Sequence, residues 1–238
     1  MFCNKCGAKA PEESLFCGKC GAPLDVKKAE KRHSSQVSQE ETYKWASKAL
    51  NGSDSEAALE ALKDLAESGH KDALYDIYNY YAEIDFSGQD TFYYIKLLYK
   101  YFPEQFDAGM LGTLAFCSFS NMKTPDDAKR TMKLCLEAYK MGNDMMPFFI
   151  GEMYYRELGV PHDLKKAAEW YEISARINPT LYEGVARWGY FVYHGIGGVR
   201  KDKYKGRQLW LEAARHGNES AKKYLKENPD TLWDKLIY

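Results

Sequence analysis

The sequence predicts an all-α fold, an α-solenoid of about five helix pairs, preceded by a short cysteine-rich segment. Three observations predict it. One residue pattern recurs with a period of about 36 residues, residues that start and stop helices occupy matching positions in each copy, and two Cys-x-x-Cys pairs stand near the N-terminus. Antiparallel helix pairs stacked at such a period form an α-solenoid.

The repeat is clearest from Gly159 to Gly217. Residues 159–163 read Gly-Val-Pro-His-Asp, and residues 198–202 read Gly-Val-Arg-Lys-Asp, 39 positions later. Further pairs at the same offset are Ala167 and Gly206, Trp170 and Leu209, Tyr171 and Trp210, Ala175 and Ala214, and Asn178 and Gly217. A spacing shared by so many positions marks an internal repeat.

An aspartate at a fixed place in each copy predicts where the first helix of each pair begins. These aspartates are Asp54, Asp90, Asp127, Asp163 and Asp202, separated by 36, 37, 36 and 39 residues. Asp is favoured at the N-cap because its carboxylate accepts the unpaired amide protons of the first turn. Fifteen positions after four of them stand Gly69, Gly142, Asn178 and Gly217, residue types that suit a positive φ just past the last turn. We therefore expect first helices of about 14 residues.

The second helix of each pair has its own signals. Asn143 and Asn218 are predicted N-caps, and Asn178-Pro179 reads as a cap followed by proline at the first helical position. Glycine recurs inside these helices in Leu111-Gly112, Ile150-Gly151 and Trp188-Gly189, 39 and 38 residues apart. Because glycine in a helix interior costs about 1 kcal/mol relative to alanine, we expect another helix to approach closely at this column.

The repeat resembles a known family. The order Ile150-Gly151-x-x-Tyr154, Gly159-Val160-x-x-Asp163, then Lys166-Ala167-x-x-Trp170-Tyr171 is similar to the Sel-one-like repeat, a relative of the tetratricopeptide repeat. The resemblance covers roughly residues 54–228 and is strongest from 127 to 217. It implies a right-handed solenoid that works as an adaptor or scaffold, often in bacterial signalling or regulation.

Shorter elements are expected at both ends of the solenoid. Residues 36–50 suggest a lone helix with Tyr43, Trp45 or Ala46, and Leu50 on one face, which would shield the first pair. A final short helix is expected after Asn228-Pro229. The charged residues 25–35 lack apolar periodicity and read as a linker. The predicted domains are thus residues 1–24, the linker 25–35, and the solenoid 36–238.

The N-terminal cysteines predict a metal site. Cys3, Cys6, Cys17 and Cys20 form two Cys-x-x-Cys pairs, and four thiolates can surround a tetrahedral Zn²⁺ at about 2.3 Å. A segment this short cannot build its own core, so metal binding would stabilise its fold. The arrangement resembles the small β zinc ribbons at the N-termini of many bacterial proteins, which implies one structural Zn²⁺ per chain.

Two other uses of these cysteines were weighed. Disulfides need an oxidising compartment, and the start of the chain has no secretory signal. A redox Cys-x-x-Cys usually occurs once, on a βαβ unit that the sequence lacks. With no run of about 18 apolar residues and a net charge of −1, we expect a cytoplasmic protein with neither membrane nor nucleic acid as its main partner.

The sequence predicts no catalytic site. Gly195–Gly198 is followed by Arg200 where a dinucleotide motif needs glycine, and no His-Glu-x-x-His occurs. The histidines lie in the linker or near predicted helix ends, and Cys117 and Cys135 are expected to be buried packing residues. Most of the 19 tyrosines are expected in the core or lining a groove.

We therefore expect a non-catalytic scaffold that binds a protein partner. Two alternatives stay open: a nucleic-acid-associated regulator that uses the ribbon as its contact module, and an enzyme with a pocket on the concave side of the solenoid.

Overall fold

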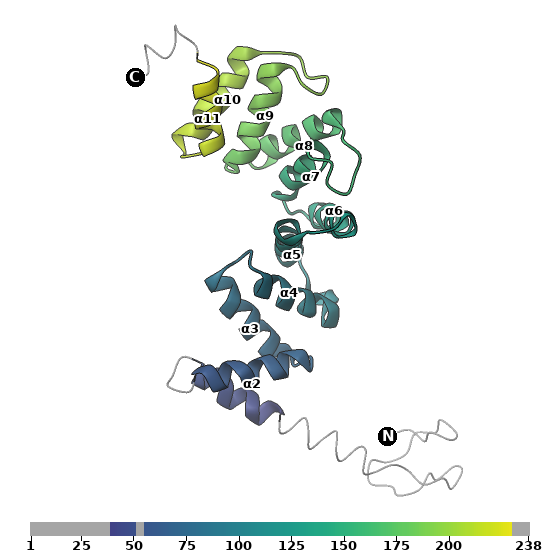
Figure 1. The fold of residues 1–238 in the computed structure, drawn as a ribbon, viewed down its shortest axis with the longest axis vertical. Helices are drawn as coiled ribbons and strands as arrows, with labels where there is room; N and C mark the ends of the chain where they lie inside the picture. The colour runs from purple at the N-terminus through teal and green to yellow at the C-terminus, as the bar shows by residue number, and fades with distance from the viewer. Residues whose placement is uncertain (1–38, 51–54, 230–238) are drawn as a thin grey trace, which may run out of the picture. The chain divides into compact units, whose positions relative to one another are not determined.

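The computed structural model describes residues 39–50 and 55–229, and these residues form helices joined by short turns (Figure 1). In this part of the chain there is no β-strand. The described residues fall into two compact units that meet within one helix, between Tyr80 and Tyr81. The all-α prediction is confirmed here, whereas the predicted ribbon lies outside the described residues.

Helices follow one another with little intervening chain. Residues 39–49 are helical. They are followed by α2 (Ser55–Glu67), α3 (Lys71–Ile84), α4 (Gln89–Tyr101), a 3₁₀ turn (Pro103–Gln105), α5 (Ala108–Asn121), α6 (Pro125–Lys140), α7 (Met146–Tyr155), α8 (Leu164–Ile177), α9 (Tyr182–His194), α10 (Lys203–Arg215) and α11 (Glu219–Glu227).

The first unit, up to Tyr80, consists of residues 39–49, α2 and the larger part of α3. Of the two residues proposed for the buried face of the first helix, Ala46 is buried and Trp45 is 46% exposed. Tyr43 and Ser47 each donate a hydrogen bond to Asp76 of α3, both at 3.1 Å. The first helix therefore packs against the pair that follows it.

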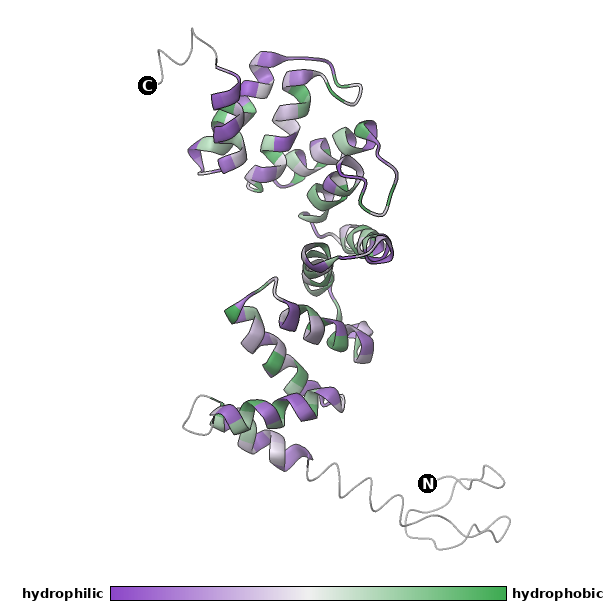
Figure 2. Ribbon diagram, in the orientation of Figure 1, coloured by the Kyte–Doolittle hydropathy of each residue, from purple (hydrophilic) through white to green (hydrophobic). Residues whose placement is uncertain are grey.

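In the second unit each helix from α5 onward packs against the next. The second helices α5 and α7 are apolar on nearly all sides, and Figure 2 colours α5 mainly green beside a largely pale and purple α6. First helices expose one polar face; in α8 the buried residues are Ala167, Ala168, Tyr171 and Ser174. Stacked helix pairs of this kind are the predicted solenoid.

The predicted N-caps are confirmed in the last two repeats. Asp163 accepts a hydrogen bond from the amide of Lys166 at 3.0 Å, and Asp202 accepts one from Lys205 at 2.9 Å. Each carboxylate satisfies an amide of the first turn that has no partner within the helix.

Two predicted N-caps are wrong, and a third cannot be placed. Thr124 caps α6, while Asp127 lies three residues inside and bonds back to the Thr124 amide at 3.0 Å. That reciprocal capping box satisfies two amides where a single aspartate would satisfy one. Asp90 lies in the first turn of α4, whose N-cap is Gly88. Asp54 lies outside the described residues.

The predicted helix stops hold wherever glycine is present. Gly69, Gly142 and Gly217 have φ of +87°, +101° and +86°. In each case the glycine amide donates to the carbonyl three residues earlier, and the next amide donates to the carbonyl five residues before it. This pair of hydrogen bonds is the Schellman motif. Asn178 also stands directly after the last turn of α8, as predicted, but the expected positive φ is wrong, because its φ is −131°. Its side chain accepts a hydrogen bond from the Leu181 amide at 3.1 Å.

The starts of the second helices were predicted less well. Asn218 caps α11 as expected, accepting from the Ala221 amide at 2.8 Å. Asn143 does not cap α7, which begins at Met146: its side-chain oxygen accepts from the Met145 amide at 3.1 Å, and its side-chain NH2 group donates to the Ala108 carbonyl at 2.8 Å. The predicted Asn178-Pro179 start is also wrong, since α9 begins at Tyr182.

The glycine column is a packing column, as predicted. A Cβ added to Gly151 would lie 2.8 Å from two ring carbons of Tyr171, and one added to Gly189 would lie 2.9 Å from the Trp210 ring. Tyr171 and Trp210 are equivalent positions of the repeat, and both are fully buried. At Gly112 the same space is filled by the Asn143 side chain. A missing side chain on each of α5, α7 and α9 therefore makes room for a neighbouring side chain.

Candidate binding grooves and the candidate metal site

A buried carboxylate organises the interior of the best-repeated region. Glu152 of α7 is 1% exposed. It lies 2.6 Å from the Arg156 guanidinium and 2.8 Å from Nε of Arg187 on α9. The hydroxyl of Tyr171 on α8 donates to the same carboxylate at 2.7 Å. Three consecutive helices are thereby joined through one charged group.

The electrostatics of this cluster fix its protonation. Burial and the charge of Glu152 raise the pKa of Tyr171, so the phenol stays protonated and donates. Burial lowers the pKa of Arg187, but the electrostatic interactions with Glu152, Tyr224, Tyr171 and Glu183 together outweigh that effect, and the net pKa is raised. Arg187 also donates to the Tyr224 hydroxyl of α11 at 2.9 Å. The oxygens of Glu152 are engaged by neighbouring groups, which is the arrangement of a structural ion pair.

The sequence analysis did not single out Glu152 as an organising residue. The sequence offered one indication of this role: Glu152 is the single charged residue in the apolar run 145–155. A charged residue in such a run is buried only when it is paired.

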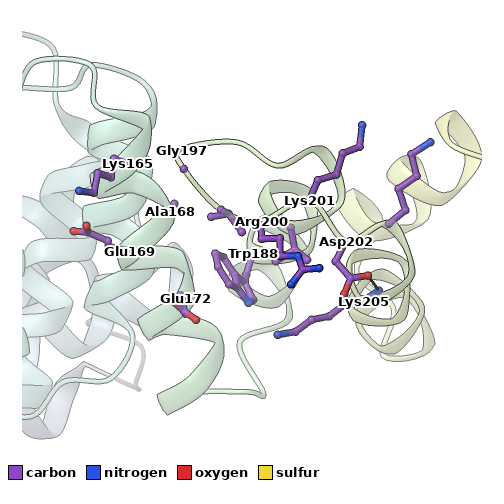
Figure 3. A pocket seen from close by; sticks show the side chains of 14 residues that line it. Lys165, Ala168, Glu169, Glu172, Trp188, Gly197, Arg200, Lys201, Asp202 and Lys205 are labelled. Carbon is purple, nitrogen blue, oxygen red and sulfur yellow. Dashed lines mark hydrogen bonds between the residues drawn. The ribbon is translucent and has the colours of Figure 1, made fainter.

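The surface of the last repeats is hollowed by a groove of about 890 Å³. One wall is α8, with Lys165, Glu169 and Glu172, and the opposite wall is the loop 197–202 with the start of α10. Between them lies Trp188 of α9, which is 8% exposed (Figure 3). We call this hollow the Trp188 groove.

The two walls of the Trp188 groove differ in charge. The loop and α10 carry Arg200, Lys201, Lys203 and Lys205, all exposed. Their field reaches the neighbouring imidazole, because burial and the charges of Lys201 and Lys203 together lower the pKa of His194. Figure 3 shows Arg200 and Lys205 on the side of Trp188 away from Glu169.

The loop that carries this basic wall is held firmly. The Asp202 amide donates to the Val192 carbonyl at 2.9 Å. Gly197 has a φ of +68°, and a Cβ there would collide with the carbonyl of Leu164 at the start of α8. The backbone therefore lies directly on the neighbouring helix, which fixes the position of the wall.

A second groove of about 830 Å³ lies between α4, α5 and α6. Its apolar lining includes Phe92, Tyr93 and Tyr99 of α4, Leu114 of α5 and Leu134 of α6. Tyr93 is 41% exposed. This Phe92 groove bears out the expectation that tyrosines line a groove as well as the core.

The two cysteines in the helical part are packing residues, as predicted. Cys117 and Cys135 are fully buried. Burial raises the pKa of Cys117 to about 11 and that of Cys135 to about 12, so both thiols stay protonated at neutral pH. Four histidines lie at or beside helix ends or in turns, as predicted; they are His70, His162, His194 and His216.

The predicted zinc ligands Cys3, Cys6, Cys17 and Cys20 all lie outside the described residues. Within residues 39–50 and 55–229, no group of three or more His, Cys, Asp and Glu side chains could hold a metal ion. Among the helices that the structure describes, none has the length and apolar character needed to cross a bilayer.

Comparisons with known proteins agree with both parts of the sequence analysis. The zinc-ribbon domain model matches residues 2–24, and the Sel1 repeat model matches residues 148–178 and 183–218. The chain thus contains a zinc-ribbon sequence and Sel1 repeats. No curated protein matches the sequence significantly.

Solved structures with the same fold are repeat proteins. The crystal structure of a Sel1 repeat protein from Oxalobacter formigenes shares 20% identity, with a TM-score of 0.54 over 79% of this chain and 74% of that one. The structure of c5321, a protective antigen of uropathogenic Escherichia coli strains with an SLR fold, shares 18% identity, with a TM-score of 0.55 over 89% of this chain. This chain covers 47% of that antigen. At these identities the likeness shows the fold alone.

Proposed function

We propose that this protein is a non-catalytic scaffold that binds another protein on the surface of its helical repeats. The observation that carries the proposal is the placement of the two grooves. Both are lined by first helices of successive pairs, α4 and α6 in one case and α8 and α10 in the other. Stacked repeats commonly use such a surface to bind partners.

The chemistry of the described residues supports binding over catalysis. The most strongly perturbed groups are the thiols of Cys117 and Cys135 and the phenol of Tyr171, which are buried in the core and line neither groove. Proteins built from Sel1 repeats are generally protein-interaction scaffolds. The grooves instead expose aromatic rings and unpaired charges, the side chains that interfaces use.

The proposal is tested by capturing partners with the purified full chain. Proteins cross-linked to it in its native cell are identified, produced separately and titrated against it. We expect the affinity of a true partner to fall when exposed groove residues such as Tyr93 or Lys205 are replaced, with helicity unchanged. A partner that binds all such variants as tightly as the wild type contradicts the proposal.

We further propose the domain division 1–24, 25–35 and 36–238, with partner binding confined to the last part. A ribbon of about two dozen residues offers too little area for a standard interface of about 800 Å² per partner. We therefore expect deletion of residues 1–24 to leave the Kd for the partner within about threefold of the full chain, measured by titration calorimetry. Capture of the partner by the isolated ribbon, and not by residues 36–238, is the opposite outcome.

We also propose that Cys3, Cys6, Cys17 and Cys20 hold one structural Zn²⁺. Four thiolate ligands fill a tetrahedral shell and leave no open position for substrate. Metal analysis of the purified protein is expected to give about one equivalent of zinc, lost in the double variant Cys3→Ser, Cys6→Ser. Zinc retained by that variant, or a disulfide among these cysteines in freshly prepared extract, disproves the assignment.

A further inference from the structure

We propose that the Trp188 groove binds an acidic segment of the partner protein, with carboxylates on the basic wall, where four cations outnumber the one carboxylate of Asp202, and an apolar side chain over Trp188. The inference rests on the proposed function and names the chemistry of the segment that the scaffold recognises.

Within the part of the chain that the structure describes, three cations of the basic wall lack an acidic partner. Many lysines and arginines elsewhere on the repeats are paired with a nearby acid, such as Lys166 with Asp163 at 3.8 Å. By contrast, Arg200, Lys201 and Lys205 have no acidic partner among residues 39–50 and 55–229, and neither has Lys165 on the facing helix. Like charges held together on a fixed loop repel one another, and an incoming anionic group relieves that repulsion.

Two loops lie at the same place in consecutive repeats. Residues 160–162 read Val-Pro-His, and residues 199–201 read Val-Arg-Lys. Both loops are tied back by the amide of the capping aspartate, that of Asp163 at 3.2 Å and that of Asp202 at 2.9 Å. Because the backbone forms without Arg200 and Lys201 in the earlier repeat, the fold does not need these cations. Their placement over a groove therefore points to a ligand.

The floor of the groove gives the segment its apolar contact. Ala168, Val192 and Val199 line the groove beside Trp188. A partly open indole among aliphatic groups favours burial of a Leu, Met or aromatic side chain.

The charge of the facing wall favours a polypeptide over a nucleic acid. Glu169 and Glu172 line the same groove, and among the described residues neither has an ion-pair partner. A nucleic acid carries a negative phosphate at every residue and would bring charge against both glutamates. A peptide can turn carboxylates to Arg200 and Lys205 and its amides or a basic side chain to Glu169 and Glu172.

The experiment uses the full-chain protein and a displayed library of random twelve-residue peptides. We expect the selected peptides to be enriched in Asp and Glu near a large apolar residue. The best peptide is then labelled with fluorescein, and its Kd is measured by anisotropy. The double variant Arg200→Glu, Lys205→Glu is expected to weaken binding about tenfold or more. A peptide with Gln and Asn in place of its acids is expected not to bind.

The matched control is Lys140→Glu, Lys226→Glu, which changes the net charge equally at exposed lysines that do not line the groove. We expect it to leave the Kd unchanged. No acidic enrichment, or equal weakening by both double variants, overturns the proposal. A labelled single-stranded oligonucleotide that binds more tightly than the peptide and displaces it assigns the groove to nucleic acid instead.

The scaffold function and the acidic-segment assignment can be contradicted independently of each other. If a cellular partner binds the repeats but the charge reversals at Arg200 and Lys205 leave its affinity intact, the acidic-segment assignment is wrong and the scaffold function stands. If no partner binds the repeats at all, the scaffold function itself is wrong.

Discussion

Replacing Glu152 with alanine is expected to lower the free energy of unfolding by about 3–5 kcal/mol, the largest effect of any single side-chain truncation proposed for this chain. The change removes the carboxylate that faces Arg187 at 2.8 Å, and the Arg187 side chain is only 19% exposed. It also leaves the Tyr171 hydroxyl without its acceptor in a fully buried position. Urea titration followed by circular dichroism measures the change.

The matched control is Glu212→Ala, which removes an exposed carboxylate 3.4 Å from Arg215. Exposed pairs of this kind are worth about 0–1 kcal/mol, so little change is expected. The double variant Glu152→Leu, Arg187→Leu is expected to recover much of the lost stability, because no unpaired charge remains buried. A Glu152→Ala protein as stable as Glu212→Ala would mean that the buried pair contributes nothing.

The second large effect is expected at Gly151. Replacement with leucine is expected to destabilise the repeats by more than about 2 kcal/mol through overpacking. Even the first added carbon would lie 2.8 Å from the Tyr171 ring. That ring cannot move aside easily, because its hydroxyl is held by Glu152 at 2.7 Å. The unfolding midpoint and slope in urea report the loss.

Gly88→Leu provides the comparison for this second effect. Gly88 has an ordinary φ of −64°, and the atoms nearest to a Cβ there belong to the exposed side chain of Asp85, at 2.9 Å and beyond. A shift of that flexible group accommodates the new side chain at small cost. Equal destabilisation by the two leucines would contradict the packing explanation, because leucine is a better helix former than glycine and helix propensity alone would favour the change at Gly151.

Much of the fold could be predicted because the signals are local. The caps Asp163 and Asp202 and the stops Gly142 and Gly217 depend on chemistry within a few residues of each helix end. The errors arose where two local signals compete. Thr124 precedes Asp127 by three residues, and the structure uses both in one capping box, which the column of aspartates alone does not reveal.

The candidate site could not be predicted in the same way. The Trp188 groove is assembled from α8, α9 and the loop before α10, and the distance between these walls depends on how the helices pack. From the sequence alone, the glycines among residues 195–198 suggested a comparison with phosphate-binding loops and did not predict a groove. The role of Asn143 was predicted wrongly for a related reason. Its side-chain amide donates to the Ala108 carbonyl, which lies 35 residues earlier, in the preceding pair.

In the loops 159–163 and 198–202, the residues that fix the backbone are different from the residues that face outward. In both, the first residue is a glycine with positive φ and the last is the capping aspartate. The second residue is valine in both, and the next two differ, with Pro161-His162 in one loop and Arg200-Lys201 in the other. Under the proposed binding mode, point mutations at these two positions alter recognition of the segment while the backbone contacts that hold the loop remain. A duplicated repeat built this way can diverge in specificity one residue at a time, without first passing through an unstable intermediate.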